Sequence, residues 1–324
     1  MRLKQRIQRL VKLTNLSNKE QKISQIRVPI DPKEFYNKLG PLDHQTTHQP
    51  VTNLTKYQID AWRDAFKHKY RLIIKSQKIG LTTSCLMEDF QRAILPSSHP
   101  LSCRGKEILI IAQTFDMAKE HLYTLRKIIM NSSFKDFLIT IPTSFLLKTE
   151  TTKASVLFIA NPENPNKPTR IIARGPRASS IWSWKEVKHI HMSDIVATNQ
   201  IDDSQLFGAA FSRLANTDGS LLIETPPIGQ RGYVWEIYKQ STLEDDENFE
   251  AGKFHLRKIP AAEAVFAGVI SQKFLDQEKE RRGILYAQLY ECEFVNPFNT
   301  WYDDSLFQYD RNLQLDGGEN NVLA

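Results

Sequence analysis

Short apolar runs alternate with longer amphipathic stretches from residue 55 onward. Each run is rich in Ile, Leu and Val, which is typical of strands that are buried on both faces of a sheet. The expected strands cover residues 71–74, 107–112, 156–160, 169–173, 187–192 and 220–224. Apolar residues at helical spacing predict helices over residues 57–66 and 115–130.

Strands that alternate with helices indicate an α/β fold, in which a mainly parallel sheet carries helices on both faces. In such folds ligands bind beyond the carboxyl ends of the strands. Residues that directly follow a strand are therefore the first candidates for chemistry. We expect residues 51–295 to form this domain and residues 296–324 to form a linker or tail.

The N-terminal segment, residues 1–50, has a different pattern. Leu3, Ile7, Leu10 and Leu13 have helical spacing among basic residues, which predicts a short basic amphipathic helix. This helix either packs on the domain or contacts nucleic acid or a partner protein. The stretch that follows is rich in Pro, His and Thr, and we expect a linker or an extended arm there.

The composition excludes several classes of protein. A chain of 324 residues that is 41% hydrophobic can bury a sizeable core. The net charge of +6, from 43 basic and 37 acidic residues, mildly favours a polyanionic partner such as nucleic acid. The three cysteines are widely spaced, so neither a disulfide scaffold nor a zinc site is indicated. No secretion signal or membrane-length apolar run is present, and we expect a cytoplasmic protein without membrane contact.

The expected strand at 71–74 leads directly into an irregular phosphate-binding loop. The usual loop is G-x-x-x-x-G-K-[ST], but here Lys75 stands in place of the first glycine and Leu81 in place of the lysine. Gly80 and Thr82 keep their usual positions, for a backbone turn and for a hydroxyl that contacts Mg²⁺. The candidate nucleotide-binding residues are Lys75, Ser76, Gln77, Lys78, Ile79, Gly80, Leu81, Thr82 and Thr83.

The loop needs a cation, and two lysines are able to supply it. Lys75 leaves the end of the strand directly below the loop, and we prefer it to Lys78 for that reason. The helix that begins after Gly80 would direct the positive end of its dipole at a phosphate.

A second strand ends on the polar pair Ser193-Asp194, where a nucleotide-hydrolysing site needs a metal-directed acid. Two assignments stay open. Asp194 is the metal-side acid, with Ile195 in the place of a catalytic Glu, or Ser193 takes the metal position and Asp194 is the base. His189 and His191 alternate along the same strand and would point to one face, where we favour contact with the core or a helix over metal binding.

Two further segments complete the candidate site. Arg174 and Arg177 lie in a loop with Gly and Pro, where a guanidinium is able to stabilise charge on a transferring phosphate. Thr225 ends the strand at 220–224 and is a candidate sensor of the terminal phosphate that relays its presence to the following segment.

In this order the motifs resemble the ATPase domain of viral and proviral large terminase subunits, over residues 53–295. Gln58, together with the preceding Tyr57, looks like the adenine-reading element of that family. The loop with Lys75 at its first position is similar to the deviant loop of the family. Arg174-Gly175 resembles its arginine-finger loop, Ser193-Asp194 falls where it has Asp-Glu, and residues 224–226 look like its coupling motif. Residues 290–294 resemble the segment that closes the domain.

The resemblance implies a P-loop NTPase fold of the RecA-like class for residues 51–295. It implies ATP and Mg²⁺ as cofactors, with Thr82 and Asp194 toward the metal. It also implies a motor that moves double-stranded DNA, works with portal and small terminase proteins, and acts as a homo-oligomeric ring. Such a ring would take an arginine from a neighbouring subunit, so a monomer in isolation would be nearly inactive. The expected location is the cytoplasm of an infected or provirus-carrying cell.

The sequence departs from the family pattern at two places, and these departures lead to alternative functions. The Asp-Glu pair is replaced by Ser193-Asp194, and the segment after Phe294 is too short for the nuclease domain with which the family usually continues. We therefore expect no nuclease activity, and we read Asp303, Asp304 and Asp310 as solvated acids. The alternatives are a decayed ATPase fold that binds DNA or viral proteins as a scaffold, and a helicase-like ATPase.

Overall fold

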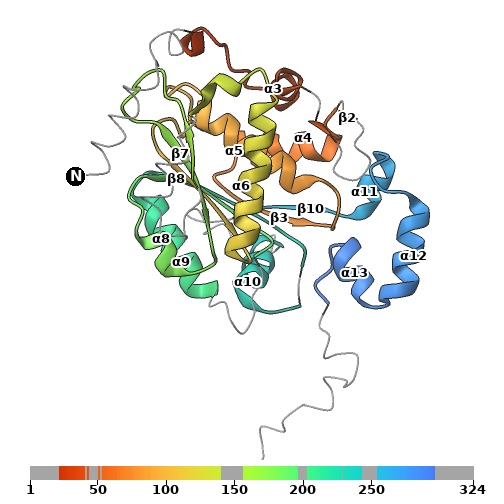
Figure 1. The fold of residues 1–324 in the computed structure, drawn as a ribbon. Coiled ribbons are helices and arrows are strands. Elements are labelled where there is room, and N and C mark those ends of the chain that lie inside the picture. Colours follow the sequence, from red (N-terminus) through yellow and green to blue (C-terminus); the bar gives the residue numbers. More distant parts are fainter. Residues whose placement is uncertain are drawn as a thin grey trace, which may run out of the picture.

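The computed structural model describes residues 22–40, 42–43, 50–51, 53–139, 156–195, 203–227, 229–242 and 254–295. An eight-stranded sheet forms the centre of the described fold (Figure 1). In spatial order its strands are β10 (His255–Ile259), β3 (Tyr70–Lys75), β9 (Ser220–Thr225), β8 (Val187–Ser193), β4 (Glu107–Ala112), β7 (Thr169–Arg174), β6 (Val156–Ile159) and β5 (Leu138–Ile139). Neighbours from β10 to β7 pair in parallel, whereas β6 and β5 are antiparallel.

The apolar runs form strands because the sheet is covered on both sides. In β4, Ile108 and Ile110 belong to one hydrophobic cluster, while Leu109 and Ile111 belong to another. Successive residues of a strand point to opposite faces, so these two clusters lie on opposite sides of the sheet. The α/β fold class, with a mainly parallel sheet and helices on both faces, is thereby confirmed.

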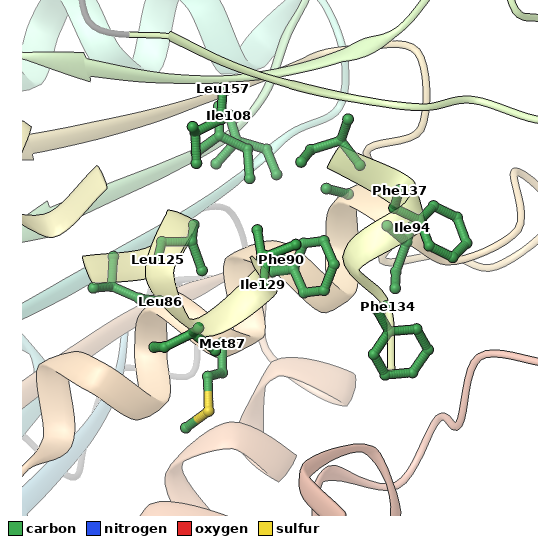
Figure 2. Packing of buried hydrophobic residues seen from close by; sticks show 14 of the residues in the cluster. Leu86, Met87, Phe90, Ile94, Ile108, Leu125, Ile129, Phe134, Phe137 and Leu157 are labelled. Carbon is green, nitrogen blue, oxygen red and sulfur yellow. The ribbon is translucent and has the colours of Figure 1, made fainter. Parts of the chain in front are cut away.

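Two long helices cover one face. They are α5 (Leu81–Ile94) and α6 (Phe115–Met130), which has the bounds that its periodicity predicts. Figure 2 shows Phe90 of α5 and Ile129 of α6 packed in the same cluster as Ile108 of the sheet. The opposite face is covered by α9 (Asp203–Ala215) and α10 (Gly232–Thr242).

The remaining helices are shorter than α5 and α6. They are α3 (Pro32–Leu39), α4 (Lys56–Arg63), α8 (Ala178–Trp182), α11 (Ala261–Phe266), α12 (Gln272–Arg282), α13 (Leu285–Tyr290) and the 3-10 turns Asp64–Phe66 and Lys135–Phe137, and they are accompanied by the antiparallel pair β1 (Leu42–Asp43) and β2 (Pro50–Val51). Helices α11, α12 and α13 follow β10 in the chain and lie together beside that edge of the sheet (Figure 1). No helix among the described residues is long and apolar enough to cross a membrane.

Helix α3 lies within the segment for which the sequence predicts a linker or an extended arm. Asp31 caps it by accepting hydrogen bonds from the backbone N–H groups of Lys33 and Glu34, at 2.9 and 3.2 Å. Phe35 is fully buried and stacks on Phe134 with ring centroids 5.1 Å apart. This part of the segment therefore packs on the domain. The expected basic helix at 1–13 and the acids of the C-terminal tail lie outside the described residues.

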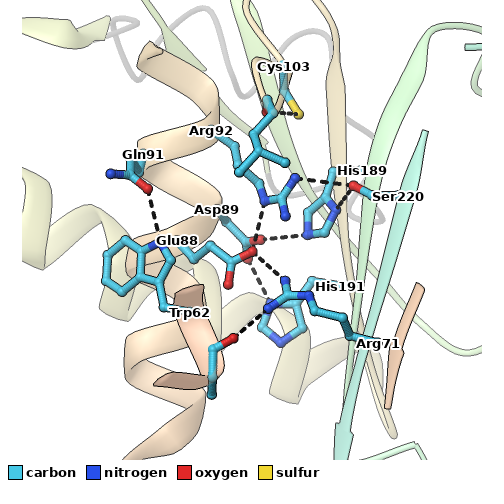
Figure 3. A network of polar contacts seen from close by, with 12 residues as sticks. Trp62, Arg71, Glu88, Asp89, Gln91, Arg92, Cys103, His189, His191 and Ser220 are labelled. Atoms are coloured by element: carbon cyan, nitrogen blue, oxygen red, sulfur yellow. Dashed lines mark hydrogen bonds and ion pairs between the residues drawn. The ribbon is translucent and has the colours of Figure 1, made fainter. Parts of the chain in front are cut away.

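A buried network of charges ties α5 to the sheet (Figure 3). Glu88 of α5 accepts hydrogen bonds from Arg71 of β3 and from Arg92, the latter at 2.8 Å. The next residue, Asp89, contacts two histidines of β8. Buried carboxylates are stable only when cations or hydrogen-bond donors surround them, so these contacts fix where α5 lies on the sheet.

The two histidines face α5, as predicted, and differ in charge. The Nδ1 atom of His189 shares a 2.8 Å hydrogen bond with Ser220, and its Nε2 lies 3.2 Å from Asp89 without hydrogen-bond geometry. Burial, reinforced by the positive charge of Arg92, lowers the pKa of His189 to about 4. Burial also opposes the charge of His191, but Asp89 and Glu224 outweigh it and raise the pKa of His191 to about 10. His189 is therefore neutral and His191 is protonated near neutral pH.

We expect His189 to make the fold sensitive to mild acid. Its pKa is 6.5 in an ordinary environment and about 4 in the folded chain, so between these values the unfolded chain binds a proton that the folded chain does not. The free energy of unfolding therefore falls as the pH decreases through this window, by on the order of 3 kcal/mol from this residue. Urea unfolding of the parent and of His189→Gln at several pH values measures the effect. The stability difference between the two should shrink from neutral pH toward acid pH, and a constant difference would contradict the neutral state of His189.

Candidate functional site

The loop between β3 and α5 is held by backbone and side-chain contacts. The backbone N–H of Ser76 donates to the carbonyl of Ile259 at 2.9 Å, and the N–H of Gln77 donates to Leu289 at 3.1 Å. Tyr57 of α4 also donates its hydroxyl to the carbonyl of Ile79 at 2.7 Å. The loop is thus fixed between β10, α13 and α4.

Gln58 lies beside the loop, as the sequence predicts, but its amide already has two partners. Its oxygen accepts from the N–H of Thr55 at 2.9 Å, which completes a capping box at the start of α4. Its Nε2 donates to the carbonyl of Gly80 at 3.1 Å. In this state Gln58 acts on the loop backbone, and the reading of adenine stays a prediction.

The start of α5 is suited to binding an anion. Gly80 precedes the helix with a φ of 71° in the left-handed region, where a side chain would be strained. No side chain caps this end of the helix. The first N–H groups of an α-helix have no partner within it, and together with the helix dipole they favour a negatively charged group.

The structure distinguishes the two candidate lysines. Lys75 ends β3 and is buried, and its Nζ donates to Thr82 Oγ1 at 2.7 Å. The same Nζ forms ion pairs with Asp194, at 3.1 Å, and with Glu224. Lys78 is exposed, and its Nζ lies 5.2 Å from the centre of the Phe274 ring. Of the two, Lys75 is therefore the cation that meets the acids.

Two neighbouring strands deliver those acids. Ser193 ends β8, Asp194 follows it, and Glu224 lies in β9 directly opposite Ser193 in the parallel register. Asp194 has a φ of 52°, and its N–H donates to the carbonyl of Glu224 at 2.8 Å. The chain thus turns sharply where the Asp194 side chain meets Lys75. We will call Lys75, Thr82, Ser193, Asp194 and Glu224 the Lys75 cluster.

Glu224 begins the segment that resembles the coupling motif, but it is not among the site residues that the sequence predicts. It is fully buried, and it contacts Thr82 Oγ1 at 3.2 Å through Oε2 and Ser193 Oγ through Oε1. The available signal was a lone carboxylate inside an otherwise apolar strand, which costs free energy unless it has a partner. The partners come from strands far away in the sequence, so the sequence does not reveal them.

The charges of the Lys75 cluster are strongly coupled. Burial alone would lower the pKa of Lys75, but Glu224 and Asp194 outweigh it and raise that pKa. Burial opposes the charge on Glu224 as well, yet Lys75 and His191 hold its pKa well below the usual value. For Asp194, burial and the negative charge of Glu224 raise the pKa despite the presence of Lys75. Glu224 is the permanently ionised acid, and Asp194 is the acid that is easier to protonate.

The other predicted residues lie around this cluster. Thr225 is buried, and its hydroxyl lies within hydrogen-bond distance of two carbonyls that share its one proton, those of Ile195 at 3.4 Å and Pro226 at 3.1 Å. It therefore connects β9 to the segment that follows Asp194. It makes no hydrogen bond to the Lys75 cluster among the described residues.

The two arginines come from β7 and the turn that follows it, away from the strand that carries Lys75. Arg174 ends β7, which is two positions from β8 and four from β3 in the sheet, so at the usual spacing its strand lies about 10 Å from that of Ser193 and about 19 Å from that of Lys75. Its guanidinium is buried, 4.5 Å from the centre of the Trp184 ring. Arg177 is exposed at the start of α8.

Of the comparisons with known proteins, the one with solved structures identifies the fold. No protein-family model matches the sequence, and no curated protein matches it. Among solved structures, the ATPase domain of the large terminase of Thermus phage P74-26 is similar with a TM-score of 0.55 and 15% identity, over 84% of this chain and 100% of that one.

Two longer terminase structures are also similar. The large terminase of bacteriophage HK97 matches with a TM-score of 0.58 and 11% identity, over 81% of this chain and 54% of that one. The large terminase of a thermophilic bacteriophage, in complex with ADP, matches with a TM-score of 0.52 and 9% identity, over 74% of this chain and 53% of that one. This chain thus spans about half the length of these two proteins. It has the P-loop NTPase fold of the ATPase domain of phage large terminases.

Proposed function

We propose that this protein hydrolyses ATP as the motor domain of a large terminase and uses the energy to move double-stranded DNA. The Lys75 cluster is the observation that carries the proposal. One buried lysine at the end of β3 meets a loop hydroxyl and two carboxylates, beside the uncapped start of α5. In hydrolytic P-loop sites, cations, a metal-binding hydroxyl and acids at adjacent strand ends surround the terminal phosphates in this way.

The residues of the loop are suited to binding a nucleoside triphosphate. The uncapped N–H groups of α5 and the ammonium of Lys75 provide positive charge on the same side of the loop. The phosphates would be held by these groups, and Gln58 lies where the loop backbone meets α4. The ADP in the similar terminase of the thermophilic bacteriophage supports a nucleotide ligand for this fold.

The residues also fit Mg²⁺, which prefers oxygen ligands and usually takes only one or two carboxylates besides phosphate oxygens and water. Thr82 Oγ1, Asp194 and Glu224 offer a hydroxyl and two carboxylates around the Lys75 ammonium, and Thr82 and Glu224 also contact each other directly. Among the described residues, no group of three or more His, Cys, Asp or Glu side chains is arranged to hold a metal by itself. Phosphate oxygens of the nucleotide would therefore complete the coordination. When bound, Mg²⁺ would neutralise phosphate charge.

Asp194 is suited to act on the attacking water. Its side chain is 29% exposed, whereas that of Glu224 is fully buried, so Asp194 is the acid that water reaches. Its raised pKa also makes it a better proton acceptor than an ordinary carboxylate. Thr225 would carry the state of the site to the segment after Asp194, through its contact with the Ile195 carbonyl.

The partners follow from the similarity to terminases and from the charge of the chain. A net charge of +6 is compatible with DNA as a ligand. We propose that the active form is a ring of identical subunits that works with portal and small terminase proteins in the cytoplasm of an infected or provirus-carrying cell. The proposal concerns residues 51–295, and the expected absence of nuclease activity stays a prediction.

The replacement of an acid by Ser193 favours one other function, that of a binding module with an inactive ATPase fold. Nucleotide binding without hydrolysis at any protein concentration, with DNA and the packaging partners present, would support this alternative.

We expect Lys75→Ala to reduce ATP hydrolysis about 100-fold or more, because it removes a cation placed toward the phosphates. The measurement is phosphate release in the presence of double-stranded DNA and the packaging partners. Lys127→Ala, which removes an exposed lysine of α6, is the matched control and should hydrolyse ATP at the parent rate. Thermal unfolding of each variant shows whether it is folded. A folded Lys75→Ala variant that is as active as the parent would exclude the proposed site.

We expect one arginine to act on the site of a neighbouring subunit. Arg177 is the better placed of the two, because it is exposed whereas Arg174 packs on Trp184. Arg177→Ala should lower hydrolysis about 1000-fold, as the loss of an arginine finger does. Mixing inactive Arg177→Ala with inactive Lys75→Ala should restore part of the activity, because each mixed interface can combine an intact Lys75 with an intact Arg177. The same mixture with Arg174→Ala tests the other candidate, and no recovery in either mixture would show that neither of these two arginines acts between subunits.

A further inference from the structure

The end of β8, where P-loop sites usually have an acid, carries Ser193 instead. The carboxylate of Glu224, from the adjacent strand β9, lies beside it. Ser193 carries only a hydroxyl, but its partner in the β8–β9 register is Glu224. Ser193 Oγ donates a hydrogen bond to Glu224 Oε1. The carboxylate of Glu224 therefore lies against the end of the Ser193 side chain, where a longer acidic residue of β8 would have placed its own oxygens.

The contact with Thr82 identifies the role of this carboxylate. In P-loop sites the metal is held by the loop Ser or Thr and by an acid from a neighbouring strand. Here Thr82 Oγ1 lies 3.2 Å from Glu224 Oε2. Asp194 forms an ion pair with Lys75 but, in the described part of the chain, makes no hydrogen bond to Thr82.

The surroundings of Glu224 hold it in this orientation. His191 Nε2 is fully buried, has no hydrogen-bond partner among the described residues, and lies 3.5 Å from Glu224 Oε1. The other nitrogen of that ring donates to Asp89 Oδ2 at 2.7 Å, and Asp89 is fixed in α5. Glu224 thus has a cation on each side, Lys75 and His191, and its Oε2 is directed at the loop hydroxyl.

We propose that Glu224 of β9 is the metal-side carboxylate of this site, in place of the missing acid of β8, and that Asp194 is left to act on water. This inference rests on the proposed ATPase function and differs from the two assignments that the sequence leaves open for Ser193 and Asp194. In both of those assignments the metal-side residue belongs to β8 or directly follows it, whereas here it comes from the neighbouring strand.

The test measures how strongly Mg²⁺ strengthens nucleotide binding. The full chain is titrated calorimetrically with β,γ-imido ATP, once with Mg²⁺ and once with EDTA, and the ratio of the two dissociation constants is the metal effect. We expect Glu224→Gln to reduce this ratio about tenfold or more, as is typical for the loss of a group that supports a metal. Binding in EDTA should not weaken, because the lost group does not contact phosphate. Asp194→Asn should change the ratio less than about threefold.

Two further variants make the result independent of folding defects. Glu236→Gln makes the same chemical change at an exposed residue of α10 and should leave the ratio unchanged. Glu224→Ser should lose the metal effect, and adding Ser193→Asp to it should restore most of the effect, because the second change returns a carboxylate to β8. The double variant still lacks Glu224. If Glu224 had only a structural role, the carboxylate at position 193 would not restore the metal effect.

The outcomes separate this inference from the function on which it rests. A metal effect in the parent that survives in Glu224→Gln but disappears in Asp194→Asn would overturn the assignment of Glu224 and leave the ATPase proposal intact. If the parent does not bind the nucleotide analogue in either buffer, the ATPase proposal fails and the assignment fails with it. Loss in Glu224→Gln and recovery in the double variant would support both.

Discussion

The structure depends on one constraint, which is that every buried charge needs a partner of opposite sign. Helix α5 carries Glu88 and Asp89 on the face that packs on the sheet, and both are almost completely buried. Their cations come from β3 and β8, through Arg71 and His191. An unpaired carboxylate at either place would cost several kcal/mol. The pairing therefore determines where α5 lies, and with it the start of the helix and the loop that precedes it.

The same constraint connects the interior to the site. The contacts run from Asp89 to His191, from His191 to Glu224, and from Glu224 to Lys75, so negative and positive charges alternate along the path. Each group stabilises the ionised state of the next one. The Lys75 cluster is thus an extension of the network that anchors α5, and its geometry is set by packing rather than by a flexible loop. This agrees with the need for a hydrolytic site to have its charges in place before the substrate arrives.

The sequence predicts those parts of the structure whose information is local. The helix at Phe115–Met130 and the strand at Glu107–Ala112 have the bounds that their periodicity indicates. The position of Lys75 at the end of a strand also follows from the local pattern, since the loop residues are consecutive. The strand His255–Ile259 was not predicted, because an edge strand with mixed burial lacks a continuous apolar run. The helix Pro32–Leu39 was not predicted either, although Asp31 followed by Pro32 is a local start signal that the prediction missed. The aromatic contact of Phe35 with Phe134, a distant part of the chain, could not be predicted from the local pattern.

Glu224 shows why the site itself is harder to predict than the fold. Its role depends on which strand lies next to β8 and on a register that pairs it with Ser193, and neither fact is contained in a local motif. In a parallel sheet, the ends of adjacent strands are about 5 Å apart, so a carboxylate of either strand can reach the same point. The proposed metal site requires an oxygen ligand beside the loop hydroxyl, whichever strand carries it. A motif search that assigns the acid to one strand therefore concludes from Ser193 that the acid is missing. The arrangement in space shows a carboxylate, that of Glu224, on the adjacent strand.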